Sequence, residues 1–166
     1  MEIAIFAIAT VAALAGGVGV IASAQPVRSA LSLLLVLGSL AVMYLLLGAE
    51  FIAVLQVIVY AGAIVVLFLF VIMLLRARRG EVAREKLPRQ RTAAVVLGGV
   101  FAAGLLYAMW PARGAVPRPL PEAFGTAQSV GGTLFSAYLL PFEVASVVLL
   151  AGIIAAVVLG RARPVT

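Results

Sequence analysis

The side chains that could take part in chemistry are few in this 166-residue chain, and three of them lie close together in one apolar stretch. Gln56 and Tyr60 are four residues apart, so on a helix the amide and the hydroxyl would share a face and could meet or share a water molecule. Gly62 follows beside a β-branched run, where a helical hydrogen-bond ladder can loosen or accommodate a π-bulge. Tight packing against a neighbouring helix is the simpler interpretation of Gly62.

Two acidic residues, Glu50 and Glu143, lie next to apolar segments. Glu50 precedes Arg76 by 26 residues, or about 39 Å along a helix, and Glu143 lies about 27 Å before the next basic residue. Both are therefore expected near the outer boundary of a membrane, where ionisable groups are candidates for proton movement. A structural role is the alternative: Pro141 suits the first position of a helix, and an acid two residues later suits the positive end of the helix dipole.

The residue types that are missing exclude several kinds of site. The chain has no His and no Cys, which excludes bis-His haem, thiolate or imidazole metal sites, iron–sulfur ligation and disulfides. Its only lysine, Lys86, lies in a charged segment, so a Schiff-base chromophore within a membrane is excluded as well. We therefore assign no catalytic, cofactor-binding or metal-binding residue to this chain.

The composition is that of a membrane protein. Apolar residues make up 65% of the chain and charged residues 11%, with a mean hydropathy of +1.25, whereas soluble domains are about half apolar and about a quarter charged. The apolar stretches approach or exceed the roughly 20 residues that a helix needs to cross a bilayer. They predict an all-α membrane protein with five transmembrane helices, at about residues 2–24, 27–49, 50–75, 92–112 and 141–160.

The first apolar stretch is interpreted as a retained helix. Glu2 precedes it and no basic segment does, which argues against a signal peptide. Residues 1–166 are thus expected to form a single integral membrane subunit. Within it, residues 76–91 form a basic loop with seven of the twelve Lys and Arg residues, and residues 111–138 form a Pro/Gly-rich external loop that could be partly re-entrant.

The basic residues predict the orientation of the chain. With five helices, ten of them fall on one side of the membrane and two on the other. The ten are those of the basic loop with Arg28, Arg161 and Arg163, and the two are Arg113 and Arg118. By the positive-inside rule the N-terminus lies outside and the C-terminus lies in the cytoplasm. The net charge of +6 therefore indicates orientation and not nucleic-acid binding.

Small residues recur at a spacing of four in the predicted first, fourth and fifth helices, which predicts that these helices have close neighbours. Gly16 and Gly19 each follow an alanine by four residues, a spacing that permits close approach of helix backbones in lipid. Ser29, Ser32 and Ser39 share one face of the second helix and could donate hydrogen bonds across an interface.

Residues 48–74 contain a distinctive sequence motif, Gln-Val-Ile-Val-Tyr-Ala-Gly-Ala, at positions 56–63. This segment closely resembles the third transmembrane helix of chain 6, or subunit J, of the proton-pumping NADH–quinone oxidoreductase, respiratory complex I. Residues 25–31, Gln-Pro-Val-Arg-Ser-Ala-Leu, and residues 130–146, from Val-Gly-Gly-Thr to Pro-Phe-Glu-Val-Ala-Ser, are similar to the family too. The three matches span most of the chain in the family's order, and the predicted topology agrees with that of the family.

The resemblance implies a role without redox chemistry in this chain. Members of the family sit in the membrane arm near the quinone-reducing junction, beside the K-, H-, A- and N-type subunits and within the lipid bilayer. NADH, FMN, iron–sulfur clusters and quinone are expected on other subunits of the complex. The implied function is that of a non-catalytic translocase subunit, in the inner (plasma) membrane of a bacterium, that helps to couple quinone reduction to proton translocation.

The resemblance also implies which residues could form a gate. The third helix of the family can hold a π-bulge near the Tyr-Ala-Gly segment, and switching between bulged and regular helix is proposed there to open or close a water path. Carried over by position, Tyr60 and Gly62 would mark the bulge, and Val65 and Phe68 would lie on the turns that rotate. A register change of one residue turns a helix by about 100°.

The proton path is expected to rely on neighbouring chains. Some relatives have Glu at the position of Gln56, and an amide can orient water but cannot carry net charge. Glu143 and Glu50 remain as peripheral candidates. Two other functions stay open: the equivalent subunit of a related cation/proton antiporter or membrane hydrogenase, and a small stand-alone transporter, which would need a charged or broken-helix site near the midplane.

Overall fold

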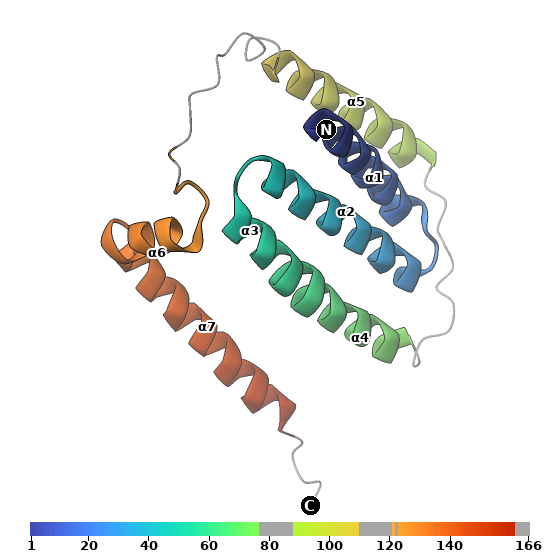
Figure 1. Ribbon diagram of the computed structural model, residues 1–166. Helices are drawn as coiled ribbons and strands as arrows, with labels where there is room; N and C mark the ends of the chain where they lie inside the picture. The colour runs from blue at the N-terminus through green and yellow to red at the C-terminus, as the bar shows by residue number, and fades with distance from the viewer. Residues whose placement is uncertain (77–87, 110–120, 122, 162–166) are drawn as a thin grey trace, which may run out of the picture. The chain divides into compact units, whose positions relative to one another are not determined.

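The computed structural model of the protein describes residues 1–76, 88–109, 121 and 123–161. All regular secondary structure within these ranges is helical (Figure 1). The chain divides into two compact units, Met1–Val71 with Glu122–Thr166, and Ile72–Pro121. Most of the basic loop and residues 110–112 of the predicted fourth helix lie outside the described residues.

The first unit contains two long helices, α1 (Glu2–Ala22) and α2 (Pro26–Leu46), followed by a third helix in three continuous parts. Those parts are α3 (Glu50–Leu55), the π-helix η1 (Gln56–Ile64) and α4 (Val65–Arg76), the last of which runs on into the second unit. Two further helices of the first unit are α6 (Ala127–Ser136) and α7 (Leu139–Gly160). The second unit contains α5 (Pro88–Met109).

Four helices within the described residues are long and apolar enough to cross a membrane. They are α1, α2, the third helix over Glu50–Leu75, and α7. The helix predicted at residues 92–112 is present as α5, but it begins earlier, at Pro88, and Ala93–Ala108 is the apolar part whose side chains the structure describes. Proline suits that first position because the N–H it lacks would have no partner there.

Helices α1 and α2 lie side by side (Figure 1), and two glycines of α1 face α2. A Cβ on Gly16 would come within 2.8 Å of Val36 Cγ2, and a Cβ on Gly19 within 2.7 Å of Ser32 Oγ. At Gly16 a Cβ would also lie 2.9 Å from the Ser32 carbonyl oxygen, so this position allows the close approach of α2 because it carries no side chain. Dispersion contact at such short backbone separation is the main attraction between helices in lipid.

Only one of the three serines of α2 bonds across this interface. Ser29 Oγ donates to the carbonyl oxygen of Val20 in α1 at 2.8 Å. Ser32 and Ser39 donate instead within α2, to carbonyl oxygens one turn earlier at 3.0 and 2.8 Å. The prediction of an interhelical hydrogen bond is therefore confirmed for Ser29 alone, and the hydroxyls of the other two satisfy themselves locally.

The connection between the third helix and α2 is short, and its conformation is set by glycine. Gly48 has a φ of +72°, in the left-handed region that a residue with a Cβ rarely enters. The N–H of Ala49 donates back to the carbonyl oxygen of Tyr44 at 2.9 Å, which closes the end of α2. The chain can thus reverse within three residues and start α3 at Glu50.

The Pro/Gly-rich segment at residues 111–138 contains a helix that the sequence analysis did not predict. Thr126 is the N-cap of α6, and its Oγ1 accepts a hydrogen bond from the N–H of Ser129 at 3.3 Å. A threonine in this position satisfies one of the free N–H groups of the first turn. Gly131 and Gly132, which suggested a loop, lie inside this helix.

Candidate functional site

The third helix contains an unusually long π-helical part. Its nine residues, Gln56–Ile64, lie between α3 and α4 without a break in the chain of helical hydrogen bonds. At its end the N–H of Val65 donates to the carbonyl oxygen of Tyr60, five residues earlier. π-Helical turns are rare, occur mostly as single turns, and are frequent at functional sites.

Gly62 lies inside this π-helix and against its backbone. A Cβ there would be 3.2 Å from the carbonyl oxygen of Val57, which is five residues earlier and thus its acceptor position in a π ladder. That separation is tighter than an ordinary van der Waals contact, so a side chain at Gly62 would press on the ladder. Tyr60 lies in the same π-helix, whereas Val65 and Phe68 follow it in α4.

The residues proposed from the sequence face different surroundings. Gln56 is only 7% exposed and lies at the start of η1, which packs against α2 together with α3. Val65 is 4% exposed. Tyr60 and Phe68 are about half exposed, at 53% and 54%. The π-helix is thus bordered by two buried side chains, and large aromatic side chains project from it and from the turn after it.

The two acids occupy different helical positions. Glu50 is the first residue of α3, so its carboxylate lies at the positive end of the helix dipole. Glu143 is not in the first turn of α7, because that helix starts at Leu139 and not at Pro141. The expected first-turn position of Glu143 was therefore wrong. Proline is accommodated as the third residue because none of the first four N–H groups has an intrahelical partner.

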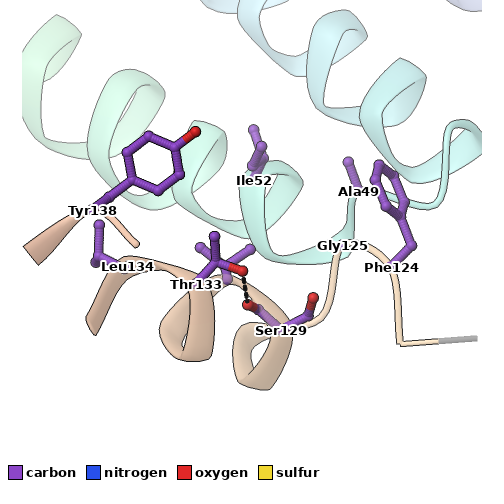
Figure 2. A pocket seen from close by; sticks show the side chains of 9 residues that line it. Ala49, Ile52, Phe124, Gly125, Ser129, Thr133, Leu134 and Tyr138 are labelled. Carbon is purple, nitrogen blue, oxygen red and sulfur yellow. Dashed lines mark hydrogen bonds between the residues drawn. The ribbon is translucent and has the colours of Figure 1, made fainter. Parts of the chain in front are cut away.

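A cavity of about 340 Å³ lies between the start of the third helix and α6. Figure 2 shows its lining, which Ala49 and Ile52 provide from one side. The other side is formed by Phe124, Gly125, Ser129, Val130, Thr133, Leu134 and Tyr138. The lining is mainly apolar, and the Thr133 hydroxyl is occupied by a hydrogen bond to the Ser129 carbonyl oxygen at 2.9 Å.

A contact between backbones lies beside the cavity, at Gly125. The N–H of Phe51, in the first turn of α3, donates to the carbonyl oxygen of Gly125 at 2.9 Å. Gly125 has a φ of +73°, and a Cβ on it would overlap the Gly48 carbonyl oxygen and lie 2.8 Å from Ala49 Cα. This contact was not predicted from the sequence, because it joins residues that are far apart in the chain.

A sequence profile of the NADH-ubiquinone/plastoquinone oxidoreductase chain 6 family matches residues 16–159. The chain belongs to this family. The matched residues include the whole third helix, the cavity and nearly all of α7.

Individual relatives of this chain 6 protein are similar over most of their length. NADH-quinone oxidoreductase subunit J of Rhodobacter capsulatus is 38% identical over 162 residues, which cover 93% of this chain and 79% of the relative. Subunit 10 of Thermus thermophilus is 40% identical over 88% of this chain and 82% of its own. Subunit J of Escherichia coli K12 is 35% identical over 97% and 87%, respectively. The family membership predicted from the sequence is confirmed.

Within the described residues, no group of three His, Cys, Asp or Glu side chains could hold a metal ion. The features that this chain offers instead are the π-helix, the buried Gln56 and a closely fitted contact between Gly48 and Gly125. These are features of helix conformation and packing.

Proposed function

We propose that this chain is a membrane-arm subunit of a proton-translocating NADH–quinone oxidoreductase, and that its third helix gates a water path that couples quinone reduction to proton movement. The observation that carries the proposal is the π-helix at Gln56–Ile64 in a chain of the chain 6 family. A nine-residue π segment in an otherwise regular membrane helix has a nearby alternative, the α-helix, from which it differs by its hydrogen-bond register.

Conversion between these two forms would move side chains at membrane depth. Shifting the register by one residue turns one part of the helix by about 100° relative to the other and displaces it by about 1.5 Å. Val65, which is 4% exposed, would then leave its buried position to a neighbouring residue. Apolar constrictions gate by excluding water, so a rotation of this size can open or close a path for it.

The proton carriers of this path belong mainly to neighbouring chains in our proposal. Gln56 is buried at the start of η1, where its amide can orient a water molecule but cannot hold net charge. Glu50 and Glu143 are exposed at or near the start of their helices and act, if at all, at the periphery of the path. This chain contributes the conformational change of its third helix. NADH, FMN, iron–sulfur clusters and quinone bind to other subunits.

The same proposal covers location and neighbours. The chain spans the inner (plasma) membrane of a bacterium five times, with the N-terminus outside and the C-terminus in the cytoplasm. Its neighbours are the K-, H-, A- and N-type membrane subunits. We propose that they cover apolar helix faces such as that of α7, because no residue of α7 is buried within this chain. The relatives are named as subunits of NADH-quinone oxidoreductases, which favours this assembly over an antiporter or hydrogenase.

The substitution Gly62→Val tests the gating role in the intact complex. In the π form the added side chain meets the Val57 carbonyl oxygen at less than an ordinary contact distance, so we expect the substitution to shift the balance between the π and α forms. We expect proton-coupled quinone reduction in membrane vesicles to fall severalfold while electron transfer from NADH to an artificial acceptor persists. Gly38→Val in α2 is the matched control, since an added Cβ there meets nothing within 4 Å. Equal loss of both activities in Gly62→Val would indicate failed assembly and count against gating.

A further inference from the structure

The two ends of the π-helix have different surroundings. On the amino-terminal side, α3 is bound through its backbone, because the N–H of Phe51 donates to the Gly125 carbonyl oxygen. That N–H belongs to the first turn, which has no acceptor within its own helix, so the bond satisfies a group that would otherwise be free. The backbones of Gly48 and Gly125 are in direct contact beside it, with no room for a Cβ on Gly125.

The side chains of α3 add a second attachment. Ala53 and Gln56 are 3% and 7% exposed, and both α3 and η1 pack against α2. The opposite flank of α3 contacts α6 across the cavity (Figure 2). A turn of α3 by about 100° would break the hydrogen bond of Phe51 and carry the buried amide of Gln56 out of its packed position.

On the carboxyl-terminal side, most of the large side chains of α4 that follow Val65 are exposed. Leu67 is 66% exposed, Phe68 54%, Phe70 62% and Met73 60%. In lipid, exchanging one exposed apolar side chain for another around a helix has little energetic consequence, because the surroundings are as apolar as the side chain.

We infer that the Gly48–Gly125 contact is a fixed mount for α3, so that a change of η1 between π and α form turns α4 and leaves α3 in place. The inference rests on the proposed gating by the third helix. Gly125 is thereby a positioning residue: it acts through the first turn of α3 and makes the conversion of η1 directional. The rotation that follows a change of η1 is therefore a rotation of α4, while α3 keeps its contact with α6.

Spin-label distances in the intact, membrane-embedded complex test this direction. The chain has no cysteine of its own, so single cysteines can be placed at Leu35 in α2 as reference, at Val54 in α3 and at Leu67 in α4. These side chains are 50%, 53% and 66% exposed. The complex without introduced cysteines supplies the background, and the labelled complexes are used if they keep wild-type coupled activity.

Distances are compared between the complex at rest and the complex frozen during turnover with NADH and quinone. A side chain about 5 Å from the helix axis moves by about 8 Å in a turn of about 100°. We expect the distance from Leu35→Cys to Leu67→Cys to change by up to about 8 Å, and the distance to Val54→Cys to stay the same. A change at Val54→Cys, with or without one at Leu67→Cys, overturns the fixed mount but leaves gating in place. No change at either position overturns the proposed gating itself.

The variant Gly125→Ala tests the mount directly, with Gly132→Ala in α6 as matched control. A Cβ at Gly132 meets nothing within 4 Å, whereas one at Gly125 overlaps the Gly48 backbone at a positive φ. In Gly125→Ala we expect the distance from Leu35→Cys to Val54→Cys to change during turnover, as it does not in Gly132→Ala. A Gly125→Ala complex that assembles and keeps this distance constant would contradict the inference. If that variant does not assemble, the labels in the otherwise unmodified chain decide alone.

Discussion

The amide backbone of Gly62 lies so close to the carbonyl oxygen of Val57 that a Cβ on Gly62 would be 3.2 Å from it. This contact joins residues five apart and therefore belongs to the π-helical form of the segment. In an α-helix the carbonyl oxygen four residues earlier takes the place of that of Val57, so a side chain at residue 62 changes its contacts when the segment changes form.

This relationship predicts a graded effect of side-chain size at residue 62. Gly62→Ala removes the flexibility of glycine in either helical form, but meets the Val57 carbonyl only in the π form. A bias of about 1 kcal/mol toward the α form would change the ratio of the two forms about fivefold. We expect the number of protons moved per NADH oxidised by inverted vesicles to fall in Gly62→Ala and further in Gly62→Val. Identical values for glycine, alanine and valine would contradict a role of the π-helix in coupling.

Gln56 offers a prediction that depends on its polarity and not on its size. The side chain is 7% exposed, so Gln56→Leu keeps an apolar volume of similar size in place but removes the amide. If the amide orients water, proton transport per NADH should fall severalfold in Gln56→Leu while the complex assembles normally. Gln56→Glu, which restores polar atoms at this position, should recover transport relative to Gln56→Leu.

The control for Gln56 is the other buried polar residue of the described segments, Ser39. Its hydroxyl is already engaged by the Leu35 carbonyl oxygen at 2.8 Å within α2. Ser39→Ala should therefore leave proton transport unchanged. A similar loss in Ser39→Ala and Gln56→Leu would show that packing of α2 against the third helix, and not the Gln56 amide, is what the substitutions disturb.

Much of the architecture could be predicted from the sequence because membrane helices carry a strong and local signal. Long uncharged stretches cannot leave backbone groups unpaired in lipid, which requires helices of about 20 residues. The starts of α1 and the third helix therefore agree with the prediction, at Glu2 and Glu50. The glycines that face α2 were also predictable, since small residues at a spacing of four favour close packing.

The features that sequence reasoning missed depend on contacts between distant residues. Gly125 and Gly48 are far apart in the chain, and the residues around each of them do not indicate that their backbones are in contact. The helix α6 was missed because Gly131 and Gly132 lower helix propensity, while its stability comes from the cap at Thr126 and its contacts with α3 and α7. The start of α7 was misplaced because a proline is tolerated anywhere in the first turn.

The packing of α1 on α2 predicts an effect on stability that is separate from coupling. Gly16→Leu would drive a large side chain into Val36 Cγ2, which a Cβ alone would approach to 2.8 Å. Overpacking of this kind costs about 1–3 kcal/mol. We expect less of the chain in assembled complex, and a lower temperature at which the purified complex dissociates. Gly17→Leu, at a neighbouring position where a Cβ meets nothing within 4 Å, should assemble as the wild type does.

Thr126 holds together the turn that presents Gly125 and the helix that follows. Its Oγ1 donates to the Ala123 carbonyl oxygen at 2.9 Å and accepts from the N–H of Ser129 at 3.3 Å. Thr126→Ala removes both bonds, and the loss of an N-cap costs about 1 kcal/mol, which corresponds to about fivefold faster opening. We expect amide hydrogen exchange in the intact complex to accelerate by this factor in α6.

The exchange of the Phe51 amide distinguishes a local effect of Thr126 from loss of the mount. This N–H is bound by Gly125, so loosening of the turn at residues 123–125 should expose it as well, although it lies in a different helix. Thr126→Ser retains a hydroxyl that can make both bonds and should restore wild-type exchange at α6 and at Phe51. Faster exchange in α6 with an unchanged Phe51 amide would mean that α3 keeps its attachment without an ordered α6, and that Gly48 and Gly125 hold each other through backbone contact alone.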